Sequence, residues 1–154
     1  MLSIQDMLGC PQRCLNDFIW LLAGIQQVEG GAGYQELVLR PMVPWREQAA
    51  GLTRLGAERD TPLGKIVSSW RRVAEGALEY NATVPPLATA TILVPTIHLG
   101  RVVITEGIGA SARAVWKAGR FVPGVPGLRS AAVSHLSSAV VAFSVGSGAF
   151  SHGR

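Results

Sequence analysis

The stretch KIVSSWRRVAEGALEYNATVPPLATATILVP, residues 65–95, decides the fold class of this chain. Side chains alternate along it with a period of two, which is the period of a half-buried β-strand. In its middle third, apolar or aromatic residues occupy one face and polar residues occupy the other. These residues are Leu78, Tyr80, Ala82 and Val84 on one face, and Glu79, Asn81 and Thr83 on the other. The segments 65–73, 77–85 and 88–95 are therefore predicted to be three consecutive strands.

Similar patterns continue on both sides of this stretch. Residues 34–41 and 51–60 are predicted to be strands, and TPLG at 61–64 is predicted to be a turn with proline in its second position. Two or three further strands are expected after residue 100; their segments are 101–107, 139–148 and 149–152. Short strands separated by turn signals indicate a mainly β fold, an antiparallel β-sandwich of about seven or eight strands.

One helix is predicted before the sandwich. The segment LNDFIWLLAGIQQ, residues 15–27, places apolar side chains at helical spacing, and Asn16 or Asp17 can cap its first amides. The glycines of GGAG, residues 30–33, are expected to end it. The sequence thus predicts two parts, a helical segment over residues 1–32 and a β-sandwich over residues 33–154.

Composition bounds the class of protein. The chain has 154 residues, 48% hydrophobic and 16% charged, which excludes a disordered tail and allows one domain with its own core. No apolar run reaches the roughly 18 residues of a membrane span, and prolines interrupt the most apolar stretch. The first residues lack the pattern of a secretion signal. We expect no membrane association, and the compartment, cytoplasmic or secreted, stays open.

The distribution of charge raises nucleic acid as a partner. All ten acidic residues precede residue 107, and five of the fourteen basic residues follow it. Those five are Arg113, Lys117, Arg120, Arg129 and Arg154. They are scattered singly, with no cluster that would neutralise adjacent phosphates, so we expect no nucleic-acid partner.

The candidate chemical groups are better explained as structure. Glu58 and Asp60 share one face of a strand and read as solvated surface, because nothing near them suggests a desolvated pocket. Cys10 and Cys14 form an i, i+4 pair, but a metal would need two more ligands. The three histidines, His98, His135 and His152, lie far away in sequence. We therefore predict no catalytic, substrate-binding, cofactor-binding or metal-binding residue in this chain, and no cofactor.

Five segments resemble a known family when they are taken in order. They are NDFIWLLAGIQ (16–26), GYQELVLRP (33–41), TPLGKIVSSWRR (61–72), LEYNATVPPLATATILVP (78–95) and VGSGAFS (145–151). This series is similar to the C-terminal end of bacterial and fungal α-L-rhamnosidases, the inverting enzymes of glycoside hydrolase family 78. The resemblance covers residues 15–151 and treats VWKAGRFVPGVPGLRSA, residues 115–131, as an insertion. It implies that the helix is the last helix of an (α/α)6 catalytic barrel and that the sandwich is the C-terminal accessory domain.

The same resemblance implies that the catalytic carboxylates are absent from this chain. The family's acid belongs to a motif like Asp-Cys-Pro-Gln-Arg-Asp-Glu in the barrel. The residues CPQR, Cys10 to Arg13, match its middle, but Gly9, Cys14 and Leu15 stand where the acidic residues belong. We therefore expect a fragment of a glycoside hydrolase that supports the barrel in carbohydrate metabolism and is inactive alone.

Two other interpretations stay open. The chain could be an independent carbohydrate-binding module, with Trp45, Trp70 or Trp116 stacking on sugar rings of rhamnosides, although Trp70 is expected to lie in the core. It could also complete an active α-L-rhamnosidase whose barrel comes from another chain. If the chain is an accessory domain, or if it completes an enzyme supplied by another chain, its expected partner is the (α/α)6 barrel. Without it, the apolar face of helix 15–27 would favour self-association.

Overall fold

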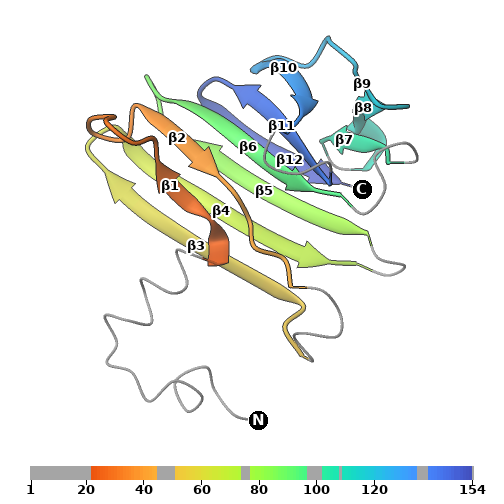
Figure 1. Cartoon of the computed structure of the whole chain (residues 1–154), viewed down its shortest axis with the longest axis horizontal. Helices are drawn as coiled ribbons and strands as arrows, with labels where there is room; N and C mark the ends of the chain where they lie inside the picture. Colours follow the sequence, from red (N-terminus) through yellow and green to blue (C-terminus); the bar gives the residue numbers. More distant parts are fainter. Residues whose placement is uncertain are drawn as a thin grey trace.

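The computed structural model describes residues 22–44, 51–73, 77–96, 102–107, 109–134 and 139–153. Two β-sheets lie face to face in this part of the chain, around one hydrophobic core (Figure 1). The smaller sheet has five strands in the order β1-β2-β6-β11-β10, and the larger has seven in the order β3-β4-β5-β12-β7-β8-β9. The expected mainly β, sandwich-like fold is therefore confirmed.

The strands are short, as the turn-rich sequence indicates. Their bounds are β1 (Ile25–Gln27), β2 (Glu36–Leu39), β3 (Arg54–Thr61), β4 (Gly64–Arg72), β5 (Leu78–Val84), β6 (Thr89–Pro95), β7 (Ile104–Glu106), β8 (Arg113–Lys117), β9 (Arg120–Phe121), β10 (Leu128–Val133), β11 (Val140–Val145) and β12 (Gly148–Gly153). A 3-10 turn, Gly109–Ser111, separates β7 from β8. In the described ranges, no helix is long and apolar enough to cross a membrane.

The stretch 65–95 forms strands β4, β5 and β6 with the predicted faces. The four apolar or aromatic residues of β5 are buried, and its three polar residues are partly or fully exposed. Trp70 on β4 is only 2% exposed and lies in the core between the sheets. The other largest side chains of the core are Tyr80, Trp116 and Phe143. Burial of such large aromatic groups removes much apolar surface from water and stabilises the sandwich, together with the aliphatic side chains of the core.

One strand pair departs from the predicted antiparallel arrangement. Strands β2 and β6 are parallel neighbours in the smaller sheet, with Glu36 opposite Thr89 and Leu39 opposite Ile92. Between them the chain crosses to the other sheet and forms β3, β4 and β5 there. Since each successive strand reverses direction, three intervening strands return β6 in the direction of β2. The prediction that all neighbouring strands are antiparallel is therefore wrong for β2 and β6.

The helix predicted over residues 15–27 is wrong at its C-terminal end. Leu22 and Ala23 are helical, but the next three residues after Gly24 form β1 and pair with β2. Gly24 has a φ of +75°, and a Cβ atom at this position would collide with the backbone carbonyl of Arg40. Only glycine combines this conformation with such a close approach. The earlier residues of the predicted helix lie outside the described part.

The predicted number of strands was too low, because three strands occur where an insertion was expected. Strands β8 and β9 flank the two-residue turn Ala118-Gly119, and β10 pairs with β11 along the edge of the smaller sheet. Both turn residues have positive φ, 51° and 75°, as in the tight hairpin turns that match strand twist. Alanine is uncommon in that conformation, so the turn gave no clear signal in the sequence.

Candidate functional site: a polar groove on the seven-stranded sheet

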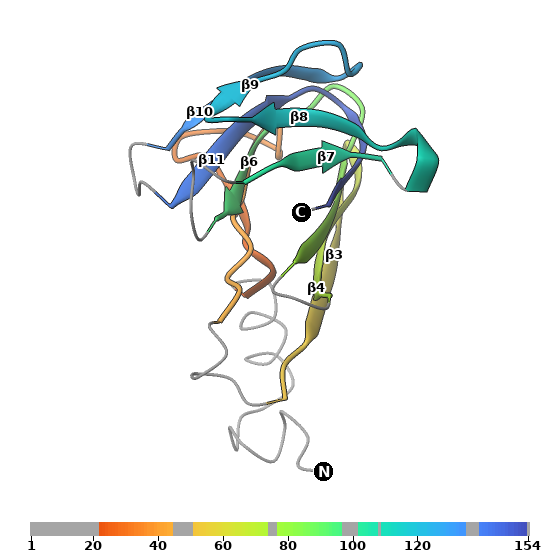
Figure 2. The same cartoon turned by 90° about the vertical axis from the view of Figure 1, so that its right-hand side faces the viewer.

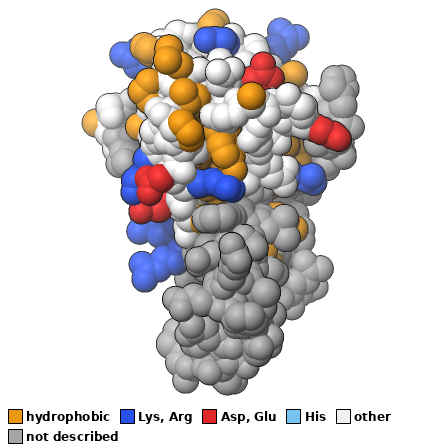
Figure 3. Space-filling view, turned by 90° about the vertical axis from the view of Figure 1, so that its left-hand side faces the viewer, with side chains coloured by type: hydrophobic (Ala, Val, Ile, Leu, Met, Phe, Trp, Pro, Cys, Tyr) orange, Lys and Arg blue, Asp and Glu red, His pale blue; other side chains and the backbone are white. Residues whose placement is uncertain are grey.

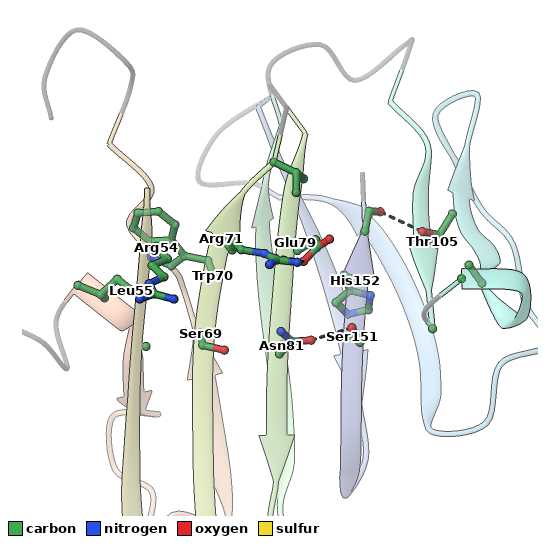
Figure 4. A pocket seen from close by; sticks show the side chains of 16 residues that line it. Arg54, Leu55, Ser69, Trp70, Arg71, Glu79, Asn81, Thr105, Ser151 and His152 are labelled. Atoms are coloured by element: carbon green, nitrogen blue, oxygen red, sulfur yellow. Dashed lines mark hydrogen bonds and ion pairs between the residues drawn. The ribbon is translucent and has the colours of Figure 1, made fainter. Parts of the chain in front are cut away.

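A groove of about 800 Å³ lies on the larger sheet and crosses β3, β4, β5, β12 and β7. Strand alternation supplies its outward side chains in two adjacent rows. The first row holds Arg54, Arg71, Glu79 and Thr105; the second holds Ser69, Asn81 and Ser151. Figure 4 shows these side chains along neighbouring strands. These two rows therefore consist of side chains that form hydrogen bonds or carry charge.

The first row carries an excess of positive charge. Arg71 on β4 lies opposite Glu79 on β5, and its Nη2 and Nε atoms donate to Glu79 Oε2 at 2.5 and 3.0 Å. On its other side Arg71 lies opposite Arg54 of β3. Among the described residues Arg54 has no ion pair. The row therefore holds two guanidinium groups and one carboxylate, which within the described part of the chain is bonded to Arg71 alone.

The second row is uncharged and offers hydroxyl and amide groups. Ser151 Oγ on β12 donates to Asn81 Oδ1 on β5 at 2.7 Å (Figure 4). This bond orients the Asn81 side chain and leaves its amide nitrogen directed away from Ser151. Ser69 is half-buried on the adjacent strand, opposite Asn81. Hydroxyl and amide groups of this kind both donate and accept hydrogen bonds.

Glycines keep the groove open. Gly56 lies opposite Ser69, and a Cβ atom at this position would be 2.8 Å from the Cβ atom of Ser69. Gly153 lies opposite Thr105, and a Cβ atom there would be 3.1 Å from the Thr105 hydroxyl. Larger residues at these two positions would therefore both fill the groove and push against its lining.

A buried contact between His152 and Glu106 supports the groove from the inner side of the sheet. Nδ1 of His152 lies 2.9 Å from Oε2 of Glu106 on the neighbouring strand, although the two atoms are not aligned as a hydrogen bond. The His152 ring stacks on Phe143 of the other sheet, with centroids 5.2 Å apart. Glu106 Oε1 also accepts the backbone N–H of Ser151 at 3.0 Å. These contacts join β12 to β7 and set the position of Ser151.

A second polar constellation, the Ser68 anchor, lies in the core and consists of Ala23, Ser68 and Tyr80. Ser68 Oγ donates to the carbonyl oxygen of Ala23 at 2.5 Å and lies 2.8 Å from the Tyr80 hydroxyl. Because a serine hydroxyl has one hydrogen, Tyr80 must be the donor in the second bond. Burial raises the pKa of Tyr80, which keeps the phenol protonated.

The anchor fixes the segment that leads into the sandwich. Besides the bond from Ser68, the backbone of Arg40 donates to Gly24 at 2.8 Å, and that of Met42 donates to Leu22 at 2.9 Å. Residues 22–27 are therefore bonded to both sheets. The backbone at Leu22, Ala23 and Gly24 is therefore held in place by hydrogen bonds.

The tryptophans proposed for sugar stacking do not form a platform in the described residues. Trp70 and Trp116 are each 2% exposed, so neither can place a ring face on a ligand. Trp45 lies outside the described part, so its role is untested. The sugar-stacking hypothesis therefore fails for the two buried tryptophans.

The other candidate groups are dispersed. Glu58 and Asp60 are exposed and lie 2.8 and 3.8 Å from Lys65, which agrees with the surface interpretation. The hydrogen bond that Lys65 donates to Glu58 raises the pKa of Lys65. Within the described ranges no three His, Cys, Asp or Glu side chains gather as metal ligands. Four candidates lie outside those ranges: Cys10, Cys14, His98 and His135.

Exposed apolar side chains do not single out another site. The large ones are Met42, Leu87, Val103, Val122 and Val133. They come from different loops and strands. Figure 3 shows hydrophobic side chains forming a band on one side of the domain, with charged side chains beside them. The polar groove is therefore the candidate site.

The described residues define a two-sheet β domain with an open polar groove and a preceding segment bonded into its core. Figure 2 shows the two sheets facing one another from the side. The family model of the bacterial α-L-rhamnosidase C-terminal domain matches residues 24–109, more than half of the chain. The chain therefore belongs to the family of bacterial α-L-rhamnosidase C-terminal domains, and the resemblance inferred from the sequence is confirmed. No curated protein matches the chain in sequence.

Two solved structures with a similar fold are α-L-rhamnosidases. The enzyme from Streptomyces avermitilis, complexed with L-rhamnose, is 22% identical with a TM-score of 0.59; that from Dictyoglumus thermophilum is 15% identical with a TM-score of 0.60. The matches cover 90% and 86% of this chain but only 10% and 12% of those chains. In both proteins the similar domain is thus one small part of a longer rhamnosidase.

Proposed function

We propose that this chain is the accessory β-sandwich of an α-L-rhamnosidase-like glycoside hydrolase and that it supports a catalytic (α/α)6 barrel without being catalytic alone. The observation that carries the proposal is the Ser68 anchor. It bonds the segment before β1 to the larger sheet, and the backbone amides of Arg40 and Met42 bond the same segment to the chain that follows β2. Together these bonds would transmit the rigidity of the sandwich to a barrel helix preceding Leu22. The helical interpretation of residues 15–21 and the division of the chain at residue 32 remain part of this proposal.

The lining of the groove supports a role that is not catalytic. Inverting glycoside hydrolysis uses two carboxyl groups about 6.5–9.5 Å apart, one acting as acid and one as base. Glu79 is the carboxylate of the groove lining, and it is bound to Arg71. One carboxylate cannot be both the acid and the base of that reaction. The sandwich would therefore depend on the barrel for chemistry.

Hydrolysis of an aryl α-L-rhamnoside tests the second half of the proposal. We expect the purified full chain to release no rhamnose above the uncatalysed rate. Turnover that is lost on Glu79→Gln would contradict the proposal, because it would place a catalytic carboxylate in this chain. Turnover that Glu79→Gln leaves unchanged would point to a contaminating enzyme, and it would have to disappear on further purification.

Association with a barrel tests the first half. The catalytic part of the S. avermitilis rhamnosidase, produced without its own C-terminal domain, is mixed with this chain and heated. We expect this chain to lengthen the half-life of rhamnosidase activity. The paired substitution Phe18→Ser and Ile19→Ser, on the apolar face of the predicted helix, should remove the effect, and Gln26→Ser on β1 should not. Equal half-lives with and without the wild-type chain would count against support of a barrel.

A further inference from the structure

We propose that the groove on the seven-stranded sheet binds an acidic oligosaccharide, whose carboxylate lies between Arg54 and Arg71 and whose hydroxyl groups bond to Asn81, Ser69 and Ser151. This role is additional to barrel support and does not depend on it. It rests on the charge of the first row, the hydrogen-bonding groups of the second row, and the open shape that the glycines maintain.

The charge argument concerns the two arginines. Like charges directly opposite each other on neighbouring strands are destabilising, yet Arg54 of β3 lies opposite Arg71 of β4. Glu79 compensates Arg71, and no described carboxylate compensates Arg54. An anion bound between the two guanidinium groups would remove this conflict. Arginine forms charge-assisted, often bidentate hydrogen bonds to carboxylates, so a carboxylate is a fitting occupant.

The class of anion follows from the second row. Asn81 and Ser151 are already bonded to each other, so their remaining donors and acceptors have fixed directions. An array of fixed amide and hydroxyl groups next to the cationic pair suits a ligand that carries several hydroxyl groups beside its carboxylate. A sugar acid has that pattern, whereas an inorganic anion would use the arginines alone.

The dimensions of the groove favour an oligosaccharide over a single sugar. It crosses five neighbouring strands, which at about 4.8 Å per strand spacing corresponds to roughly 19 Å. Trp70, the aromatic side chain of the lining, is buried and offers no stacking face. Recognition in the described groove would therefore depend on charge and hydrogen bonds, and affinity should fall as salt concentration rises.

The test is calorimetric titration of the full chain with trigalacturonate and with its carboxyl-reduced, neutral counterpart. We expect saturable binding of the acid and at least about tenfold weaker binding of the neutral trimer, as expected for loss of one charge-assisted contact. Arg54→Gln should weaken binding of the acid about tenfold, and Arg120→Gln on the distant strand β9 should leave it unchanged. Asn81→Ala should also weaken binding, by at least about threefold.

Four results would overturn the proposal. The first is no saturable heat at millimolar trigalacturonate, and the second is equal affinity for acidic and neutral trimers. The third is equal loss of affinity for Arg54→Gln and Arg120→Gln, which would indicate non-specific attraction. The fourth is a loss for Arg54→Gln with none for Asn81→Ala, together with displacement by inorganic phosphate, which would indicate a general anion site. Arg54 is exposed on an edge strand, so its variant should fold even if Asn81→Ala does not.

Discussion

Replacement of Ser68 by alanine measures the strength of the anchor. The Ser68 side chain is fully buried and bonds to the Ala23 carbonyl at 2.5 Å and to the Tyr80 hydroxyl at 2.8 Å. Alanine would remove both hydrogen bonds and leave two buried polar groups without a partner. Since each such group costs about 1–3 kcal/mol, we expect Ser68→Ala to lower the free energy of unfolding by roughly 2–6 kcal/mol. That is a large part of the about 5–15 kcal/mol typical of a domain.

Urea unfolding followed by tryptophan fluorescence gives the free energy, and Ser69→Ala is the matched control. Ser69 is the next residue on β4, faces the groove, and makes no side-chain hydrogen bond within the described residues. Its replacement should change the free energy by less than about 0.5 kcal/mol. A double-mutant cycle with Tyr80→Phe adds a second readout. The loss of unfolding free energy in the double variant should be smaller, by about 1 kcal/mol, than the sum of the losses in the two single variants. The reason is that Tyr80→Phe removes the tyrosine hydroxyl that Ser68→Ala leaves without a partner.

Two results would refute this reasoning. If Ser68→Ala and Ser69→Ala cost the same free energy, the buried hydroxyl contributes nothing beyond an exposed one. If the cycle is additive, the Ser68–Tyr80 bond carries no coupling energy. In either case the anchor could not transmit rigidity to a preceding helix, and the proposed supporting role would lose its main argument.

Three further predictions concern the backbone and the buried tyrosine. Gly24→Ala should destabilise the domain by roughly 2 kcal/mol or more in urea unfolding, because its positive φ and the nearby carbonyl exclude a side chain. The free energy of unfolding should fall as pH rises above about 10, by up to about 1.4 kcal/mol per pH unit. The reason is that the unfolded state loses the Tyr80 proton, while burial keeps the native phenol protonated. Urea midpoints measured from about pH 9 to 11.5 should show this fall in the wild-type chain and not in Tyr80→Phe. Leu87 is 87% exposed and has a φ of 63°, a conformation that asparagine adopts more easily than leucine. Leu87→Asn should therefore raise the free energy of unfolding by about 1 kcal/mol, whereas Val122→Asn, at an exposed position without positive φ, should give no such gain.

Only part of the candidate site could be predicted from the sequence. Alternation along 65–73 and 77–85 correctly places Ser69, Arg71, Glu79 and Asn81 on the face opposite the core. Alternation alone cannot show that these residues line a groove, because nothing local shows which strand lies next to which. Ser151 joins them only because β12 pairs with β5, an interaction 70 residues apart in the chain. Such a pairing has no signal in a single segment, so the groove could not be predicted.

The sequence by itself determined the class of the domain and the inner and outer faces of its central strands. Both follow from local periodicity, since neighbouring side chains on an extended backbone must point to opposite sides. Only the tertiary structure decided where the preceding helical segment ends, which strands are parallel, and which polar residues form a groove. Those features depend on contacts between distant segments, as when the Arg40 carbonyl approaches Gly24 and turns an apolar run with helical spacing into strand β1.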